Sequence, residues 1–223
     1  MVIFRNRFEA GRKLAEKMKI SKKIFNNIIV LGIPRGGISV GYPIAKKYYS
    51  YLEPITLEKI PVPDNDYMEY GAITLDRHII LNDKLIKQKH VDNEEIEPVI
   101  DKAYEEVLRR DKLFRGFKTF PNLEKRTIII VDDMLSKGYT MLAAIKYAKE
   151  NKAGRIFVAI PVAYYEAFNL VKDEVDDIIC LYVSRDSSFN IASCYEYFPD
   201  MKDKEVTEIL NMSQEIYKIT DNK

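Results

Sequence analysis

Residues 127–140 read Thr-Ile-Ile-Ile-Val-Asp-Asp-Met-Leu-Ser-Lys-Gly-Tyr-Thr. The first five residues are all β-branched, and a short run of this kind is typical of a buried strand. Two aspartates follow the run, and a short loop containing Gly138 leads into a helical pattern at 138–151. Carboxylates are costly to bury unless something pairs with them. The stretch therefore predicts a strand, a polar loop and a helix, with a ligand site in the loop.

This loop combines two kinds of binding group. Asp132 and Asp133 can accept hydrogen bonds from sugar hydroxyls. Backbone N–H groups and the dipole at the start of the helix favour a phosphate. Ser136 and Thr140 add hydroxyl donors, and Lys137 adds a positive charge. A phosphorylated sugar would use both the acids and the phosphate-binding groups. For the two aspartates alone, the simpler interpretation is an N-capped helix beside a solvated aspartate pair.

Apolar runs and helical patterns alternate along the rest of the chain. We predict strands at 28–33, 55–60, 79–82, 127–132, 155–162 and 178–183, and helices at about 39–50, 92–117, 138–151 and 164–174. Continuous apolar strands separated by helices imply a parallel sheet that is covered on both faces. The predicted fold is therefore α/β, a Rossmann-like parallel sheet flanked by helices, in which ligands bind beyond the carboxyl ends of the strands. Receiver domains also carry an aspartate pair after a strand, but after their first strand, whereas this pair follows the fourth.

Two further helical patterns, at 4–19 and 203–217, flank this core. We expect a single domain over 1–223, with its core at about 27–183. The flanking pieces, about 1–26 and 184–223, are expected to cap one end of the sheet as a small hood.

The bulk composition is that of an ordinary globular protein. The 223 residues carry a formal net charge of +1, which argues against a long nucleic-acid-binding stripe. No apolar run approaches the roughly 18 residues of a membrane span, and we find no signal-peptide pattern. Cys180 and Cys194 lack metal-ligand spacing and are expected to be reduced thiols. We therefore expect a cytoplasmic protein that binds neither nucleic acid nor a membrane.

The loop after the first predicted strand contains Arg35-Gly36-Gly37. Consecutive glycines let the backbone approach an anion closely, and arginine is a bidentate donor to oxyanions. A tight turn that needs glycine for its geometry is the alternative, and it would be favoured if this motif stood alone.

The second predicted strand ends in Glu58-Lys59 and leads into a polar stretch, 61–75. Its prolines and turn formers exclude regular structure and indicate a lid or binding loop. Lys59 is interpreted either as an anion ligand or as a surface lysine.

Residues 128–140 resemble the thirteen-residue phosphoribosyl-diphosphate signature of type I phosphoribosyltransferases. That signature has four apolar residues, two acids, two apolar residues, and a phosphate loop with Gly and a final Thr. In that family the acids hold the ribose 2′- and 3′-hydroxyls, and the loop holds the 5′-phosphate. The resemblance therefore implies ribose ligands at Asp132 and Asp133. It implies 5′-phosphate ligands at Ser136, Lys137, Gly138, Tyr139 and Thr140.

The same resemblance assigns the other two loops. The family binds diphosphate after the first strand, often with a cis non-proline peptide, and a lysine after the next strand contacts diphosphate while a loop closes. Diphosphate ligands are thus implied at Arg35, Gly36, Gly37 and Lys59, with loop 61–75 closing over the site. The implied catalytic residues are Asp132, Asp133 and Lys59.

The resemblance extends over nearly the whole chain to a bacterial and archaeal subgroup described as "predicted phosphoribosyltransferases". The matching stretches include Phe4-Arg5-Asn6-Arg7, Gly32-Ile33-Pro34-Arg35-Gly36-Gly37 and Ala159-Ile160-Pro161-Val162. The subgroup has no agreed substrate, so it implies a phosphoribosyl donor without naming the acceptor.

The implied reaction transfers 5-phosphoribosyl from phosphoribosyl diphosphate to a nitrogen nucleophile, with a nucleobase as the favoured small-molecule acceptor, and releases diphosphate. Magnesium would be held through the substrate near Asp132 and Asp133, without a cage made by the protein alone. We expect the base pocket under the hood, at Tyr195 and Phe198. The resemblance also allows a homodimer.

Two residues depart from the family pattern. Several purine- and orotate-using members carry an acid where this chain has Ser136, and a small or hydroxyl residue where it has Lys137. A non-catalytic regulatory protein that binds phosphoribosyl diphosphate or a nucleotide is therefore the main alternative. A third is an enzyme of this fold that uses another ribose-phosphate ligand. The basic run of Arg109, Arg110, Lys112, Arg115 and Lys118 is interpreted as a solvated face, and His78 and His90 receive no role.

Overall fold

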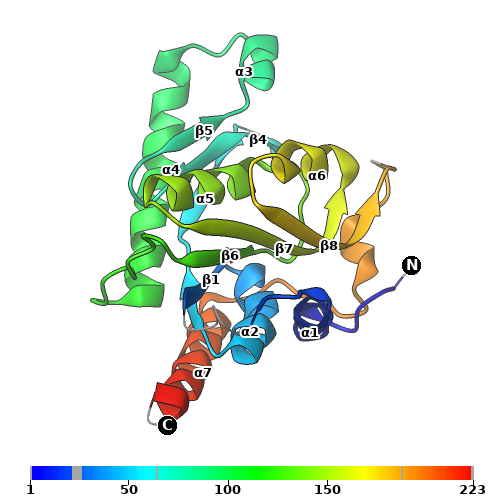
Figure 1. Cartoon of the computed structure of the whole chain (residues 1–223). Helices are drawn as coiled ribbons and strands as arrows, with labels where there is room; N and C mark the ends of the chain where they lie inside the picture. Colours follow the sequence, from blue (N-terminus) through cyan, green and yellow to red (C-terminus); the bar gives the residue numbers. More distant parts are fainter. Residues whose placement is uncertain (1, 22–26, 64, 187, 222–223) are drawn as a thin grey trace.

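The computed structural model describes residues 2–21, 27–63, 65–186 and 188–221, and Figure 1 draws the whole chain. The helices are α1 (Arg7–Lys17), α2 (Gly36–Tyr48), α3 (Asp83–Lys89), α4 (Asn93–Arg115), α5 (Tyr139–Glu150), α6 (Tyr165–Lys172) and α7 (Asp203–Asp221), with a short 3-10 helix, η2 (Ile191–Cys194). The strands are β1 (Ile28–Gly32), β2 (Tyr51–Pro54), β3 (Leu57–Val62), β4 (Asn65–Thr74), β5 (Ile79–Leu81), β6 (Thr127–Val131), β7 (Arg155–Tyr164) and β8 (Asp177–Ser184). Within the described ranges, none of the helices reaches the length and hydropathy that a bilayer crossing requires.

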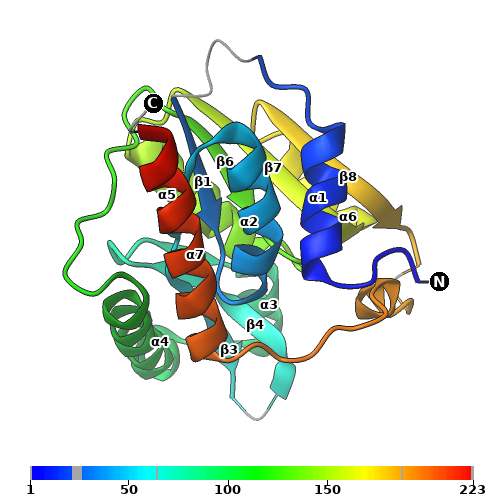
Figure 2. The same ribbon diagram turned by 90° about the horizontal axis from the view of Figure 1, so that it is seen from below.

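Five strands form the predicted parallel sheet, in the order β2-β1-β6-β7-β8. β1 and β6 lie side by side at its centre, and every residue of both strands is buried. Successive residues of β1 alternate between two cores, because side chains of a strand point to opposite faces. Val30 packs on the face covered by α1, α2 and α7, and Leu31 on the face covered by α5 and α6 (Figures 1 and 2). The parallel sheet covered on both faces is therefore confirmed.

A second, antiparallel sheet in the order β3-β4-β5 corrects part of the prediction. The apolar run at 55–60 was expected to be a single strand of the parallel sheet. Instead β2 pairs with β1 and ends at Pro54, and β3 begins at Leu57 in the small sheet. β5 falls within the predicted strand 79–82 but also belongs to the small sheet. An apolar run indicates a strand, whereas the sheet it joins depends on partners distant in sequence.

The predicted irregular stretch 61–75 is also corrected, because most of it forms strand β4. Pro61 is tolerated because the β3–β4 register shifts on both sides of it, where the regular ladder is interrupted. Asp64 of this stretch lies outside the described residues.

The terminal pieces are arranged differently from the expected hood. α1 and α7 pack with α2 against one face of the parallel sheet, with Leu14, Ile38 and Val206 in one core. The two termini do meet, through a bridge between Phe4 and Tyr195. Residues 22–26 of the expected hood lie outside the described residues. The stretch Phe198–Met201 is the part of the C-terminal piece that lines the cavity at the carboxyl ends of β1 and β6.

Candidate functional site

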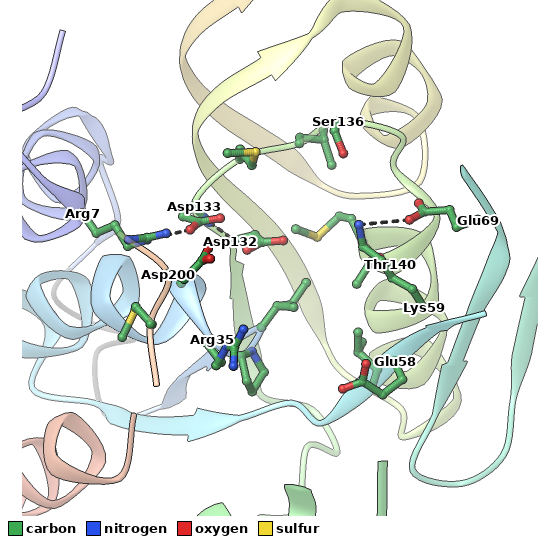
Figure 3. A pocket seen from close by; sticks show the side chains of 18 of the residues that line it. Arg7, Arg35, Glu58, Lys59, Glu69, Asp132, Asp133, Ser136, Thr140 and Asp200 are labelled. Carbon is green, nitrogen blue, oxygen red and sulfur yellow. Dashed lines mark hydrogen bonds and ion pairs between the residues drawn. The ribbon is translucent and has the colours of Figure 1, made fainter. Parts of the chain in front are cut away.

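A cavity of about 410 Å³ lies where the sequence places the three loops (Figure 3). Its walls come from the segments after β1 and β6, from β3, and from the C-terminal stretch. The predicted site residues that line it are Arg35, Gly36, Lys59, Asp132, Asp133, Ser136, Gly138, Thr140 and Phe198. The lining does not include Gly37, Lys137, Tyr139 or Tyr195.

Asp133 is fixed by its neighbours on three sides. Its backbone N–H donates to Asp132 Oδ1 over 2.8 Å, and Tyr195 Oη donates to its carbonyl oxygen over 2.6 Å. Its Oδ2 accepts a hydrogen bond from Arg7 Nε over 2.7 Å, within an ion pair whose side chains are 11% and 13% exposed. The pair of acids therefore has a set geometry before any ligand enters.

The two acids differ in their electrostatic surroundings. Burial and the neighbouring charge of Asp133 raise the pKa of Asp132 well above its ordinary value. Asp133 instead has the Arg7 guanidinium as its direct partner, with Arg7 Nε 2.7 Å from Asp133 Oδ2. The charged form of Asp132 is therefore disfavoured in the free protein, and a cation placed beside it would offset that cost.

Arg7 joins three segments of the chain, although sequence reasoning assigned it no role. Besides Asp133, it donates from Nη1 to Pro199 O over 2.8 Å, and its guanidinium lies 3.7 Å from the centre of the Phe198 ring. As the first residue of α1, it places a cation at the positive end of a helix dipole, which is unfavourable without a carboxylate partner. An arginine at the first position of a helix is therefore a sequence feature that indicates a nearby carboxylate partner.

We expect Arg7→Gln to lower the free energy of unfolding by about 3–5 kcal/mol, because breaking a buried ion pair leaves the other charge uncompensated. Urea denaturation at pH 7 would measure the loss. Arg12→Gln on the same helix is the control, since the Arg12 side chain is 58% exposed and its pairs with Glu9 and Glu16 are long, at 3.6 and 4.0 Å, so that the change in stability should be less than about 1 kcal/mol. Equal stability of the two variants would contradict the structural role of the Arg7–Asp133 pair.

The loop after the acids leads directly into α5. Gly138 precedes the helix with φ of 95°, a left-handed conformation that favours glycine. No described side chain caps this end of α5, so the N–H groups of its first turn are available to an anion. Ser136 and Thr140 line the cavity beside this end, whereas Lys137 is exposed and outside the lining.

The loop after β1 has the form that the resemblance implies, including a cis peptide between Pro34 and Arg35. The Arg35 side chain is partly exposed, with Nη1 3.9 Å from Asp203 Oδ1. The two glycines have different roles. A Cβ on Gly36 would lie 1.8 Å from Asp133 Oδ2, and a Cβ on Gly37 would lie 2.4 Å from the backbone oxygen of Val131. Gly36 therefore makes room for the acid, whereas Gly37 lets α2 approach β6.

Lys59 lies on β3, and its Nζ is 3.0 Å from Glu69 Oε2 on the neighbouring strand β4. The lysine side chain is 60% exposed, whereas Glu69 is buried. Both residues line the cavity. Lys59 is thus a partly solvated cation at the edge of the site, held there by an acid that the sequence did not single out.

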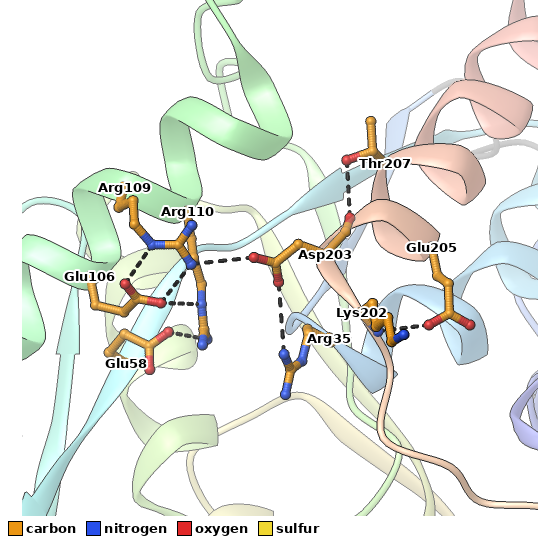
Figure 4. A network of polar contacts seen from close by, with 9 residues as sticks. All are labelled: Arg35, Glu58, Glu106, Arg109, Arg110, Lys202, Asp203, Glu205 and Thr207. Atoms are coloured by element: carbon orange, nitrogen blue, oxygen red, sulfur yellow. Dashed lines mark hydrogen bonds and ion pairs between the residues drawn. The ribbon is translucent and has the colours of Figure 1, made fainter.

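Two residues of the basic run depart from the expected solvated face, whereas Arg109, Lys112 and Lys118 are exposed. Arg110 and Arg115 have side chains that are 21% and 4% exposed, respectively, and both form ion pairs. Arg110 contacts Glu58 and lies 2.8 Å from Glu106, while Arg109 joins Glu106 to Asp203 (Figure 4). Through Asp203 this network reaches Arg35.

Glu58 lines the cavity within this network, and its carboxyl group is mostly buried. Burial raises its pKa from 4.5 to about 7; Arg110, Arg35 and Arg109 act in the opposite direction, and Glu106 adds to the increase. The carboxyl group of Glu58 therefore titrates close to neutral pH.

Because the pKa of Glu58 is higher in the folded chain, its stabilising contribution is complete below about pH 4.5 and is lost as the pH rises through about 7. We expect wild-type stability to fall relative to Glu58→Gln between pH 4.5 and 8, by at most about 3 kcal/mol. Urea denaturation across this range would measure the difference. Glu208→Gln, at an exposed pair on α7, should give a constant difference from wild type. A constant difference for Glu58→Gln as well would refute the raised pKa.

The two aromatic residues assigned to a base pocket have other partners. The Tyr195 ring is buried, with the residue only 5% exposed, and it stacks on Phe198 with ring centres 4.6 Å apart. Phe198 lines the cavity but also carries the Arg7 guanidinium over its ring. Tyr195 thus supports the acid loop rather than facing the cavity, and Phe198 has little free face to offer a base.

Known proteins match this chain over most of its length. The family model for the phosphoribosyl transferase domain matches residues 5–199. Two Mycobacterium tuberculosis proteins, from strains CDC 1551 and H37Rv and named provisionally as phosphoribosyl transferases, are 30% identical over 212 residues, or 95% of this chain and 47% of theirs. The chain thus spans about half the length of these relatives.

A solved structure shares the fold over nearly its whole length. The crystal structure of TT1426 from Thermus thermophilus has a TM-score of 0.75 and 26% identity, covering 94% of this chain and 98% of that one. The family match covers most of the chain, including all three loops around the cavity. This chain is therefore a member of the phosphoribosyltransferase family, with the α/β fold of its type I members.

Proposed function

We propose that this protein transfers the 5-phosphoribosyl group of phosphoribosyl diphosphate to a nitrogen nucleophile, a nucleobase, and releases diphosphate. The observation that carries the proposal is the convergence of the acid pair, the start of α5 and the Arg35 loop on one cavity. The acid pair suits the ribose, the start of α5 suits the 5′-phosphate, and the Arg35 loop suits the diphosphate. The three together support this donor better than any one motif does.

The placement of the donor follows from the chemistry of each wall. One oxygen of each acid already has a partner, Asp132 Oδ1 with a backbone N–H and Asp133 Oδ2 with Arg7. The second oxygens of Asp132 and Asp133 would accept from the two ribose hydroxyls. The first turn of α5, with Ser136 and Thr140, would take the 5′-phosphate. Arg35 and Lys59 would bind the diphosphate, and the N–H of Gly36 is at the start of α2 beside them.

Mg²⁺ fits the charge distribution of this cavity. The lining carries the cations Arg7, Arg35, Lys59 and Arg110 and the acids Glu58, Glu69, Asp132, Asp133 and Asp200. These formal charges nearly cancel, so a polyanion is better accommodated together with its own cation. Asp132 and Asp133 would hold the ion along with substrate oxygens, because Mg²⁺ prefers oxygen ligands. Bound there, Mg²⁺ would neutralise charge on the leaving diphosphate.

The residues of the chain would act by positioning and by charge. The bond between ribose C1′ and the diphosphate oxygen breaks, and its electron pair leaves with the diphosphate beside Arg35 and Lys59. The acceptor nitrogen forms the new bond to C1′, and its proton passes to the leaving diphosphate or to water. Asp132 and Asp133 would hold the sugar in place, so that C1′ is already oriented toward the acceptor nitrogen when the bond forms. Leu57, Leu135 and Met141 supply an apolar wall suited to an uncharged heterocycle.

A turnover assay tests this proposal. The protein would be incubated with phosphoribosyl diphosphate, Mg²⁺ and a panel of purine and pyrimidine bases, and diphosphate release would be measured. Release that depends on one base supports the proposal. Tight donor binding without turnover would favour the regulatory protein instead. That alternative is suggested by Ser136, which stands where several family members have an acid. Binding of a different ribose phosphate alone would favour the third alternative, and no binding at all would refute the shared site.

The homodimer that the resemblance allows remains a prediction. The α4 region exposes Leu108, Leu113 and Phe117, apolar side chains that a second copy could cover. Sedimentation velocity at the concentrations of the turnover assay would measure the oligomeric state.

A further inference from the structure

A second cluster of potential ligands lies away from this cavity, where the turn between β4 and β5 meets the end of α5. His78 Nδ1 is 2.9 Å from Asp76 Oδ2 and 2.6 Å from Glu150 Oε2. The three side-chain atoms all lie within 4.8 Å of one another. Asp76 and His78 come from the turn, whereas Glu150 is the last residue of α5. Two carboxylates from separate elements therefore converge on one imidazole nitrogen.

Hydrogen bonding does not account for this convergence. Nδ1 carries at most one hydrogen, which can point at only one acceptor. Nδ1 is buried from solvent and makes no hydrogen bond with the described residues. The two carboxylates also repel each other at this separation. A cation held between the three groups would offset this repulsion and give the ring nitrogen a partner.

Two of the three residues, Asp76 and His78, are held by a buried residue behind them, Thr74. The Thr74 hydroxyl donates to Asp76 Oδ1, which turns Oδ2 toward His78. Thr74 Oγ1 also accepts from the His78 backbone N–H over 3.0 Å, and Thr74 N donates to His78 O over 2.9 Å. Thr74 is only 1% exposed, so these contacts are shielded from water. Partners of this kind fix the ligands in protein metal sites.

We propose that Asp76, His78 and Glu150 bind a divalent cation of the class that takes mixed imidazole and carboxylate ligands, with Zn²⁺ as the representative ion. Such ions bind nitrogen and oxygen at about 2.0–2.2 Å, which separates adjacent ligand atoms by roughly 3.0–3.4 Å. The present separations of 2.6 and 2.9 Å require only that the side chains move apart by roughly half an ångström. Three protein ligands leave further positions for water.

The bound ion would join two parts of the molecule. The β4–β5 turn belongs to the small sheet that carries Lys59, and α5 begins at the loop beside Thr140. α5 already packs against β4 and β5 (Figure 1). A cation at the far end of α5 would add a direct link between its last residue and the turn. This site shares no residue with the lining of the cavity. The metal-site proposal can therefore be refuted without affecting the proposed transferase function.

Metal titration of the full chain tests the site. Protein freed of metal would be titrated with Zn²⁺ by calorimetry and with Co²⁺ by visible absorption. The chain contains two histidines, so NMR can assign the liganded ring, and His90→Gln is the matched control. We expect one ion per chain, a shifted His78 ring signal, and binding weakened at least about tenfold in His78→Gln, since even outer partners of a metal are worth about 10–100-fold.

Glu150→Gln tests the same site from α5, and circular dichroism would confirm that each variant is folded. It should also lose binding, whereas His90→Gln and the double substitution Asp132→Asn with Asp133→Asn should keep it. The proposal is overturned if neither ion binds, if the His78 signal does not respond, or if binding disappears with the acids of the cavity instead.

Discussion

The double substitution Asp132→Asn with Asp133→Asn is expected to weaken the binding of phosphoribosyl diphosphate by about 10²–10⁴-fold. Each carboxylate would accept a hydrogen bond from a ribose hydroxyl, and such charge-assisted bonds contribute about 1.5–3 kcal/mol each. Two of them give about 3–6 kcal/mol, and every 1.4 kcal/mol is a factor of ten in affinity. Calorimetric titration in the presence of Mg²⁺ would measure the change.

The single variants Asp132→Asn and Asp133→Asn should differ from each other in stability. This difference separates an effect on folding from an effect on donor binding. The raised pKa of Asp132 means that its charge is unfavourable in the free protein, so Asp132→Asn should keep or increase stability. Asp133→Asn leaves the Arg7 charge without its carboxylate and should destabilise the fold. Asp177→Asn, on the exposed end of β8, is the matched control and should bind normally. Wild-type affinity in the double variant would overturn the ribose assignment.

The central sheet and the acid loop were predictable because both depend on local sequence. The run at 127–131 is β-branched throughout, and the resulting strand is entirely buried. Asp132, Gly138 and the start of α5 follow within one short segment, so their proximity needs no knowledge of distant contacts. The loop containing Arg35 was predictable for the same reason, because it joins one strand directly to one helix.

The remainder of the site depends on contacts between distant residues. Arg7 and Asp133 are 126 positions apart in the chain, and Arg110 and Glu58 are 52 apart. A basic run on a helix gives no local sign of whether its charges meet water or buried acids, so the α4 arginines were assigned to a solvated face. The β3–β4 hairpin was missed because Pro61 suggests a loop, whereas it falls where the register shifts.

These distant contacts change how the departures from the family pattern are interpreted. Lys137 is exposed and does not line the cavity, so its charge is not placed to replace a missing group. Ser136 does line it, and the cavity has other acids, among them Glu58 with its pKa near 7. The cavity therefore contains acids even though position 136 has none. This weakens the case for a purely regulatory protein, and turnover remains the decisive measurement.

Gly36→Ala is expected to abolish donor binding through a single methyl group. The added Cβ would lie 1.8 Å from Asp133 Oδ2 and 2.9 Å from Arg7 Nε, so the Asp133 carboxylate must shift, and we expect its ion pair with Arg7 to be lost. Loss of a buried pair costs about 3–5 kcal/mol, whereas alanine is favoured over glycine in a helix by only about 1 kcal/mol. Urea denaturation and calorimetric titration of the same samples would measure both effects.

The cause of the Gly36→Ala defect can be isolated by a double substitution. Gly36→Ala with Asp133→Ala removes the group that the methyl would strike, so the destabilisation should be less than the sum of the two single changes. Donor binding should stay lost, because the ribose ligand is still missing. Gly116→Ala is the control for backbone strain alone, because its φ is 65° but its Cβ would meet no atom within 4 Å, and it should bind the donor normally. Additive losses, or normal binding by Gly36→Ala, would mean that contact between the Arg35 loop and the acid pair does not shape the site.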